Sequence, residues 1–242
     1  MTASLRLFLS LTILAWTTAQ ALAVPGRAEV MKVVGTATVS KATGGSASIT
    51  QGMVLGTGDT ITTGPAATVD LNLGLNGDFL RVDPDSSLKI DNLDIANVAD
   101  RTVTTQLHVN QGGITGNVVN KLTKASKYEI KSASGVAGIR GTVYSVKTDA
   151  SGRITRIVVT SGTVTFNQGG VAVTITAGQA LTPPAVGTTM TQAMVGTATT
   201  AESYLTASAG ALLLAGKNAD LLQGIVGTVI TNPADVSTSQ KN

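Results

Sequence analysis

Cysteine is absent from the 242-residue chain, histidine occurs once, at His108, and only 3% of the residues are aromatic. Disulfides and thiol chemistry are therefore excluded, and a zinc site built from cysteine and histidine is not expected. The sequence also has no G-x-S-x-G, Walker A or dinucleotide-binding pattern, which are the usual signs of hydrolases and nucleotide-binding enzymes. We therefore expect a protein that is not an enzyme and needs no cofactor or metal.

Charged residues are also scarce, at 13% of the chain, and the formal net charge is +3. Such a small excess gives no strong basic field, so nucleic acid is not an expected partner. Hydrophobic residues nevertheless make up 43% of the chain. This is enough apolar surface to offset the entropy cost of folding, so intrinsic disorder of the whole chain is excluded.

The abundant residues are those of strands and turns: 37 Thr, 26 Val and 27 Gly. Apolar and polar residues alternate from Glu29 to Leu181, most clearly over residues 69–75, 103–109 and 171–175, and Gly, Asn, Asp or Pro interrupts the alternation at short intervals. A period of two with frequent turn residues is typical of strands that bury one face. The pattern predicts an all-β domain of many short strands, in a sandwich, a closed sheet or a solenoid.

The first 23 residues have the three parts of a secretory signal. Arg6 precedes an apolar stretch over residues 7–16, and Ala21 and Ala23 form an A-x-A cleavage site. We expect cleavage near Ala23, export to the periplasm or the cell exterior, and no integral membrane span in the mature chain. An uncleaved membrane anchor is the alternative, but the apolar stretch is shorter than the roughly 20 residues of a spanning helix.

The last part of the chain changes period after Pro183 and Pro184. Apolar residues then recur every three or four positions, which predicts two helices over about 189–215 and 218–230. This helical tail, residues 185–231, either caps the β domain, binds a partner or a second copy, or lies on a membrane surface. The polar stretch 232–242 is expected to be disordered.

Two short motifs within the β region are the strongest local signals. The first is the turn at Gly58-Asp59, where a positive φ angle or a side-chain-to-backbone bond is needed. The second is R-G-T-V-Y-S-V, which runs from Arg140 through Gly141, Thr142 and Tyr144 to Val146.

The physical interpretation of the second motif is structural. Gly138 and Gly141 are expected to allow close backbone approach at a bend, with Tyr144 and Val146 on one face of the strand that follows. A buried Arg140 would need an acidic partner or several carbonyls; Asp59 and Asp85 are the candidate partners.

These motifs and their order resemble a FecR domain, the extracytoplasmic module of regulators of ferric citrate uptake. The resemblance covers about residues 33–181 and is carried by the stretches 33–39, 51–90, 107–118, 128–149, 157–166 and 173–181. It implies a β-solenoid-like or distorted jelly-roll domain without catalytic activity. The structural motif that it implies consists of Gly58, Asp59, Arg140, Gly141, Thr142 and Tyr144.

Together with the patterns above, the resemblance gives the expected domain organisation: a signal peptide over 1–23 and a helical tail over 185–231 from the residue patterns, a FecR-like β domain over 24–184 from the resemblance, and a disordered end over 232–242 from its polarity. FecR regulators normally carry a cytoplasmic anti-sigma segment and one membrane span before this domain. Here the β domain follows the predicted cleavage site directly, so we expect a chain without the anti-sigma segment.

Two charged regions are candidate ligand sites. The acidic one holds Asp83, Asp85, Asp91, Asp94 and Asp100, which are either calcium ligands or solvated turn residues. The basic one holds Lys121, Lys124, Lys127, Lys131 and Arg140 against Glu129, and it is either a solvated loop or a contact for anionic envelope polymers. His108 falls on the polar face of its strand, where a single histidine is usually solvated.

The function that these features favour is a noncatalytic binding module in the cell envelope, with a role in envelope signalling and a protein or an envelope polymer as partner. The alternative is a structural or self-assembling envelope protein, in which exposed strand edges or the Ala-rich helices join copies. The sequence does not determine the oligomeric state.

Overall fold

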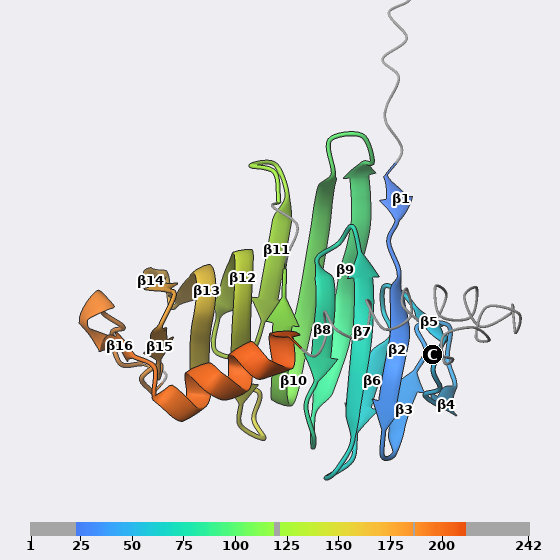
Figure 1. Ribbon diagram of the computed structural model, residues 1–242, viewed down its shortest axis with the longest axis horizontal. Coiled ribbons are helices and arrows are strands. Elements are labelled where there is room, and N and C mark those ends of the chain that lie inside the picture. Colours follow the sequence, from blue (N-terminus) through green and yellow to red (C-terminus); the bar gives the residue numbers. More distant parts are fainter. Residues whose placement is uncertain (1–22, 119–121, 186, 212–242) are drawn as a thin grey trace, which may run out of the picture.

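The computed structural model describes residues 23–118, 122–185 and 187–211. Nearly all of the predicted signal peptide, the second predicted helix (218–230) and the end segment 232–242 therefore lie outside the described residues. The expected all-β fold is confirmed, because the described residues form one open sheet of sixteen strands with one α-helix beside it (Figure 1).

The strands and the single 3-10 turn have these bounds: β1 Val24–Pro25, β2 Ala28–Val34, β3 Ala37–Ser40, β4 Ser46–Ser48, β5 Val54–Leu55, β6 Thr60–Thr63, β7 Thr68–Gly74, β8 Asp78–Val82, β9 Ser87–Asn97, β10 Thr102–Asn117, β11 Lys127–Lys131, β12 Val136–Thr148, β13 Ile154–Gln168, β14 Val171–Thr176, β15 Gln179–Leu181, η1 Gln192–Met194 and β16 Val195–Thr197. The described part of the α-helix spans 200–211.

The sheet is mixed and is not closed on itself. Its main path runs β16-β15-β13-β12-β11-β10-β8-β7-β2-β5, and the remaining strands pair off this path. All pairs are antiparallel except β10 with β11, which run parallel. The α-helix crosses one face of the sheet from the β15–β16 side toward β10 (Figure 1).

Glycine bends inside the longest strands fold this sheet over a single core. β10 pairs with β9 and β11 along its first part, then with β12 from Gly112 and with β8 from Ile114. β12 and β13 also change partner strands along their length. The register between these two strands shifts between Arg140 and Val143. Gly112, Gly141 and Gly162 at these points have φ angles of 82°, 59° and 78°, which glycine adopts without the penalty that other residues incur.

Gly112 and Gly162 are among the glycines that interrupt the alternating pattern, so the sequence predicts them to be turn residues before short strands. In the structure both lie within strands of 16 and 15 residues, because a left-handed glycine in a bulge bends a strand without ending it. The result is a folded open sheet, closer to the distorted jelly roll than to a regular solenoid.

The expected alternation of buried and exposed residues is confirmed in this sheet. Val69, Leu71 and Leu73 of β7 are at most 1% exposed, and Val173 and Ile175 of β14 are equally buried. Buried side chains from both halves of the bent strands form one main cluster. This shared core holds the two halves of the bent strands together.

Two tyrosines form the polar centre of the core. The hydroxyl groups of Tyr128 and Tyr144 lie 3.1 Å apart, and their rings meet edge to face at 76° with centroids 6.4 Å apart. Each ring lies over a glycine: a Cβ atom on Gly77 would be 2.1 Å from the Tyr128 ring, and one on Gly116 would be 2.4 Å from the Tyr144 ring. Burial strongly raises the pKa of Tyr144, and the neighbouring Tyr128 adds to the rise.

The first predicted helix begins later than expected. The prediction started it at residue 189, but residues 192–194 form a 3-10 turn and 195–197 form β16, which pairs with β15. The spacing of apolar residues over this segment has another cause than a helix. Met190 is buried in the main core, at 2% exposure, and β16, which follows it, pairs with β15 at the edge of the sheet.

Helix 200–211 begins at a capping box formed by Thr199 and Glu202. The Glu202 carboxylate accepts a bond from the Thr199 backbone N–H at 2.9 Å, and the Thr199 hydroxyl accepts one from the Glu202 backbone N–H at 3.2 Å. This reciprocal pair satisfies backbone donors at the helix start.

The same helix is tied to the sheet at two points. Arg156 of β13 donates two hydrogen bonds, of 2.8 and 2.9 Å, to Glu202, and Asn117 of β10 donates one of 3.1 Å to the Gly210 carbonyl. The described part of the tail therefore lies against the β domain, with Tyr204 and Leu205 facing outward at 71% and 67% exposure.

Candidate functional site

The Gly58-Asp59 motif forms a loop that the Asp59 carboxylate holds together. Asp59 is only 5% exposed and accepts hydrogen bonds from the Lys41 ammonium at 2.9 Å and from the backbone N–H groups of Ala42 and Gly56 at 3.0 Å each. Burial raises the pKa of Asp59, but these hydrogen bonds outweigh it and hold the pKa below its ordinary value. Gly58 has a φ of 92°, so the geometry is that of a structural loop.

The second motif forms the bulge in β12. Gly141 has a positive φ, the Thr142 hydroxyl donates to the Thr163 carbonyl at 3.1 Å, and the Thr142 carbonyl accepts from the Val118 N–H at 3.0 Å. The close approach expected at Gly138 is not found, since a Cβ atom there would be 3.7 Å from its nearest neighbour. The tight contact is instead at Gly162, where a Cβ atom would lie 2.0 Å from the Gly141 carbonyl oxygen.

The suggested burial of Arg140 with an acidic partner is wrong. Its side chain is exposed, and no ion pair joins it to Asp59 or Asp85 within the described residues. The bulge at Gly141 turns Arg140 to the outer face of β12, while Asp59 is already bound to Lys41. Tyr144 and Val146 of the same strand are fully buried.

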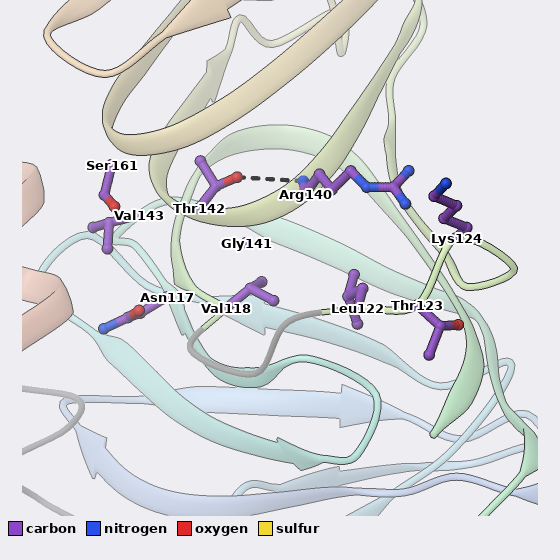
Figure 2. Close-up of a pocket in the computed structure, with 10 residues that line it drawn as sticks. All are labelled: Asn117, Val118, Leu122, Thr123, Lys124, Arg140, Gly141, Thr142, Val143 and Ser161. Carbon is purple, nitrogen blue, oxygen red and sulfur yellow. Dashed lines mark hydrogen bonds between the residues drawn. The ribbon is translucent and has the colours of Figure 1, made fainter. Parts of the chain in front are cut away.

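Arg140 instead borders a large pocket, which the bulge at Gly141 helps to form. The pocket has a volume of about 1030 Å³ and is lined by Asn117, Val118, Leu122, Thr123, Lys124, Arg140, Gly141, Thr142, Val143 and Ser161 (Figure 2). Three segments form it: the end of β10, residues 122–124, and the bulge of β12 with the adjacent bend of β13.

The pocket has an apolar floor and a cationic side. Val118 and Leu122 are buried, at 3% and 8% exposure, and the Arg140 and Lys124 side chains extend along the same side of the pocket (Figure 2). None of the ten lining residues is acidic. Neither cation has an ion-pair partner within the described residues, so both charges are available to an anionic group.

The other cations of the predicted basic region are already paired. Lys127 lies 3.0 Å from Glu129, and Lys131 lies 3.3 Å from Asp91. Lys121 is outside the described residues. Of the five predicted cations, the structure therefore brings only Lys124 and Arg140 together at the pocket.

The predicted acidic region does not converge on one point. Asp91 contacts Lys89 and Lys131 at 3.3 Å each and lies 3.9 Å from the His108 ring, while Asp83 faces Arg81 and Lys147 on another part of the sheet. Within residues 23–118, 122–185 and 187–211, no group of three or more acidic or histidine side chains is placed to hold a metal ion. The calcium alternative therefore gains no geometric support there.

A smaller cavity of about 310 Å³ lies between helix 200–211 and the sheet. Its lining is unusually polar for a helix-sheet contact and includes Arg81, Asp83, Lys147, Arg156 and Glu202. Burial raises the pKa of Asp83, although Lys147 and Arg81 counteract the rise. The hydrogen bonds from Arg156 and Thr199 lower the pKa of Glu202 to about 2.

Sequence reasoning found Lys124, Arg140, Gly141 and Thr142 but missed Asn117 and Ser161 of the same pocket. Nothing in the local sequence marks these two residues, because strand pairing brings them to the bulge. The Arg156–Glu202 contact was also missed, although T-x-x-E at Thr199 and Glu202 is a capping-box pattern that locates the helix start.

Residues 59–165 match the family model described as FecR protein. This chain contains a FecR domain. The FecR match includes the R-G-T motif, the bulge and much of the pocket lining, and it begins at Asp59.

Two solved structures are similar to the FecR-domain chain, and both are of a "putative anti-sigma factor" from Parabacteroides distasonis ATCC 8503. Each shares 9% identity and covers 57% of this chain, with TM-scores of 0.45 and 0.44. This chain spans 59% of the length of those chains. No curated protein matches the sequence. Among the described residues, no helix has both the length and the hydropathy of a membrane span.

Proposed function

We propose that this chain is an exported, noncatalytic FecR-domain protein that acts as a binding module in envelope signalling. Residues 1–23 direct its export to the periplasm or the cell exterior, with cleavage near Ala23. Its partner is a protein or an envelope polymer that presents carboxylate or phosphate groups to the pocket beside Gly141. Nucleic acid is not the partner.

The observation that supports this function is the pair of unpaired cations beside an apolar floor. Lys124 and Arg140 have no acidic neighbour among the pocket lining, whereas Lys127 and Lys131 each contact a carboxylate. An arginine fork and a lysine ammonium are suitable donors for carboxylate or phosphate oxygens. The β12 bulge fixes the Arg140 backbone, so part of the entropy cost of binding is already met by folding.

The test is binding of defined polyanions to the mature chain, measured by fluorescence anisotropy with labelled polyglutamate and polyphosphate. The two probes distinguish an acidic protein from a phosphate polymer. The pocket variant is K124Q/R140Q, and the matched control is K127Q/K131Q, which removes the same charge from the neighbouring strand β11.

We expect the pocket variant to bind about fivefold more weakly, since each exposed charge pair contributes about 0.5 kcal/mol. The control should change binding much less, because its cations are already neutralised by Glu129 and Asp91. An equal loss in both variants would show attraction by net charge alone and would contradict the proposed site. Absence of binding to both probes would contradict the anionic partner.

A further inference from the structure

The outer edge of β14 is closed by glutamine side chains. Among the described strands, β14 pairs only with β13, so within this part of the chain its other edge carries backbone groups without a strand partner. The Gln192 side chain accepts a hydrogen bond from the Thr174 N–H at 2.8 Å and donates one to the Thr174 carbonyl at 2.7 Å. The side-chain Oε1 of Gln179 accepts a hydrogen bond from the Thr176 N–H at 2.9 Å.

The two bonds of Gln192 are those that a neighbouring strand would make. In an antiparallel hydrogen-bonded pair, opposite residues exchange one N–H···O bond in each direction. The primary amide of Gln192 supplies the same donor and acceptor to Thr174. Glutamine side chains therefore make the hydrogen bonds to the β14 backbone that a neighbouring strand would otherwise make.

The sequence of β14 itself has none of the usual features that prevent pairing. Proteins protect exposed edges with charged residues, proline, bulges or covering loops. β14, with the sequence V-A-V-T-I-T, has no charged residue and no proline, and it continues in register with β13 over all six residues. Its protection is the segment 187–194, here called the cover segment, which carries Gln192 and is anchored in the core by the buried Met190.

A second copy of the chain matches this edge in charge and in hydrogen bonding. An antiparallel pair centred on Thr174 would place Thr174 opposite the Thr174 of the second copy, and these two residues would exchange the bonds that Gln192 now makes. Val173 of each copy would then lie opposite Ile175 of the other, which extends the buried row of both sheets without bringing charges together.

We infer that the edge of β14 is a self-pairing surface that the cover segment keeps closed, with Gln192 and Gln179 as the closing residues. The partner is a second copy of this chain. This inference does not depend on the polyanion pocket, because it concerns another edge of the sheet and its readout is molecular mass.

The experiment compares three purified chains by sedimentation velocity and light scattering over a wide concentration range. The open-edge variant, Q179A/M190A/Q192A, removes both amides and the core anchor. The matched control, M53A/Q106A/Q111A, removes the same residue types from other parts of the β region. A third chain adds Thr174→Pro to the open-edge variant; proline removes the outward N–H and is tolerated on an edge strand.

We expect the open-edge variant to approach twice the mass of the wild type as concentration rises, with the control unchanged and Thr174→Pro restoring the wild-type mass. A folded open-edge variant that keeps the wild-type mass would overturn the inference, and so would association that Thr174→Pro does not reverse.

A milder variant, Q179A/Q192A, keeps the anchor and tests the closure directly. Its Thr174 and Thr176 amides should exchange with solvent faster than in the wild type. Unchanged exchange at both amides would show that the glutamines do not close the edge and would also overturn the inference.

Discussion

Gly116 is predicted to be intolerant of even one added methyl group. A Cβ atom at this position would lie 2.4 Å from the Cζ and Oη atoms of Tyr144. The Tyr144 ring is fully buried, and its hydroxyl bonds to that of Tyr128 at 3.1 Å, so the ring has no free space to move into. Overpacking of this kind costs about 1–3 kcal/mol.

Gly138 provides a matched control on the adjacent strand β12. Neither glycine has a positive φ, and a Cβ atom on Gly138 would meet only the Thr165 carbonyl oxygen, at an ordinary 3.7 Å. Gly138→Ala should therefore be neutral or stabilise the fold by about 0.4–1 kcal/mol through the unfolded state. The main difference between the two substitutions is that the added methyl group meets the Tyr144 ring only at position 116.

The assay is urea unfolding followed by circular dichroism. Gly116→Ala should lower the midpoint below that of the wild type, and Gly138→Ala should not. In a Tyr144→Leu background, Gly116→Ala should cost less than in the wild type, because the ring atoms that it strikes are gone. A Gly116→Ala protein as stable as Gly138→Ala would refute the role assigned to the tyrosine pair.

Two further predictions concern the helix contact and the bulge. The pKa of Glu202 is about 2, below its ordinary 4.5, so its contribution to stability is present above about pH 4.5 and declines as the pH falls toward 2. The hydrogen-exchange protection factors of helix 200–211 should fall over this range, and Arg156→Gln should lower them at neutral pH. Protection factors that stay constant down to pH 2 would argue against the contact. Gly162→Ala should destabilise the fold more than Gly141→Ala, because both have a positive φ but only the Gly162 methyl would strike backbone, 2.0 Å from the Gly141 oxygen; equal thermal midpoints for the two would contradict this.

Much of the β domain could be predicted because its information is local. Alternation over residues 69–75 and 171–175 identifies both the strands and their buried faces, and the Gly58-Asp59 pair marks a real loop. The bends at Gly112 and Gly162 could not be recognised, since glycine in a bulge and glycine in a turn look the same in sequence. The difference lies in which strands pair on either side, which is a long-range property.

The pocket was predictable only in part for the same reason. Lys124 and Arg140 stand out as cations, but their freedom from ion pairs follows from where Glu129 and Asp91 lie across the sheet. Asn117 and Ser161 reach the pocket through pairing of β10, β12 and β13. The late start of the helix likewise reflects β16, whose three residues join the sheet although their spacing resembles a helix.

The most direct test of the proposed binding site is a titration of isotopically labelled mature protein with polyglutamate and polyphosphate, followed by NMR chemical shifts. The proposed site predicts that the largest shifts occur at Val118, Lys124, Arg140, Thr142 and Ser161, which border the pocket, and that K124Q/R140Q needs about five times more probe to reach the same shifts. Shifts concentrated instead around Lys127 and Lys131 on β11, or spread evenly over all exposed cations, would contradict it.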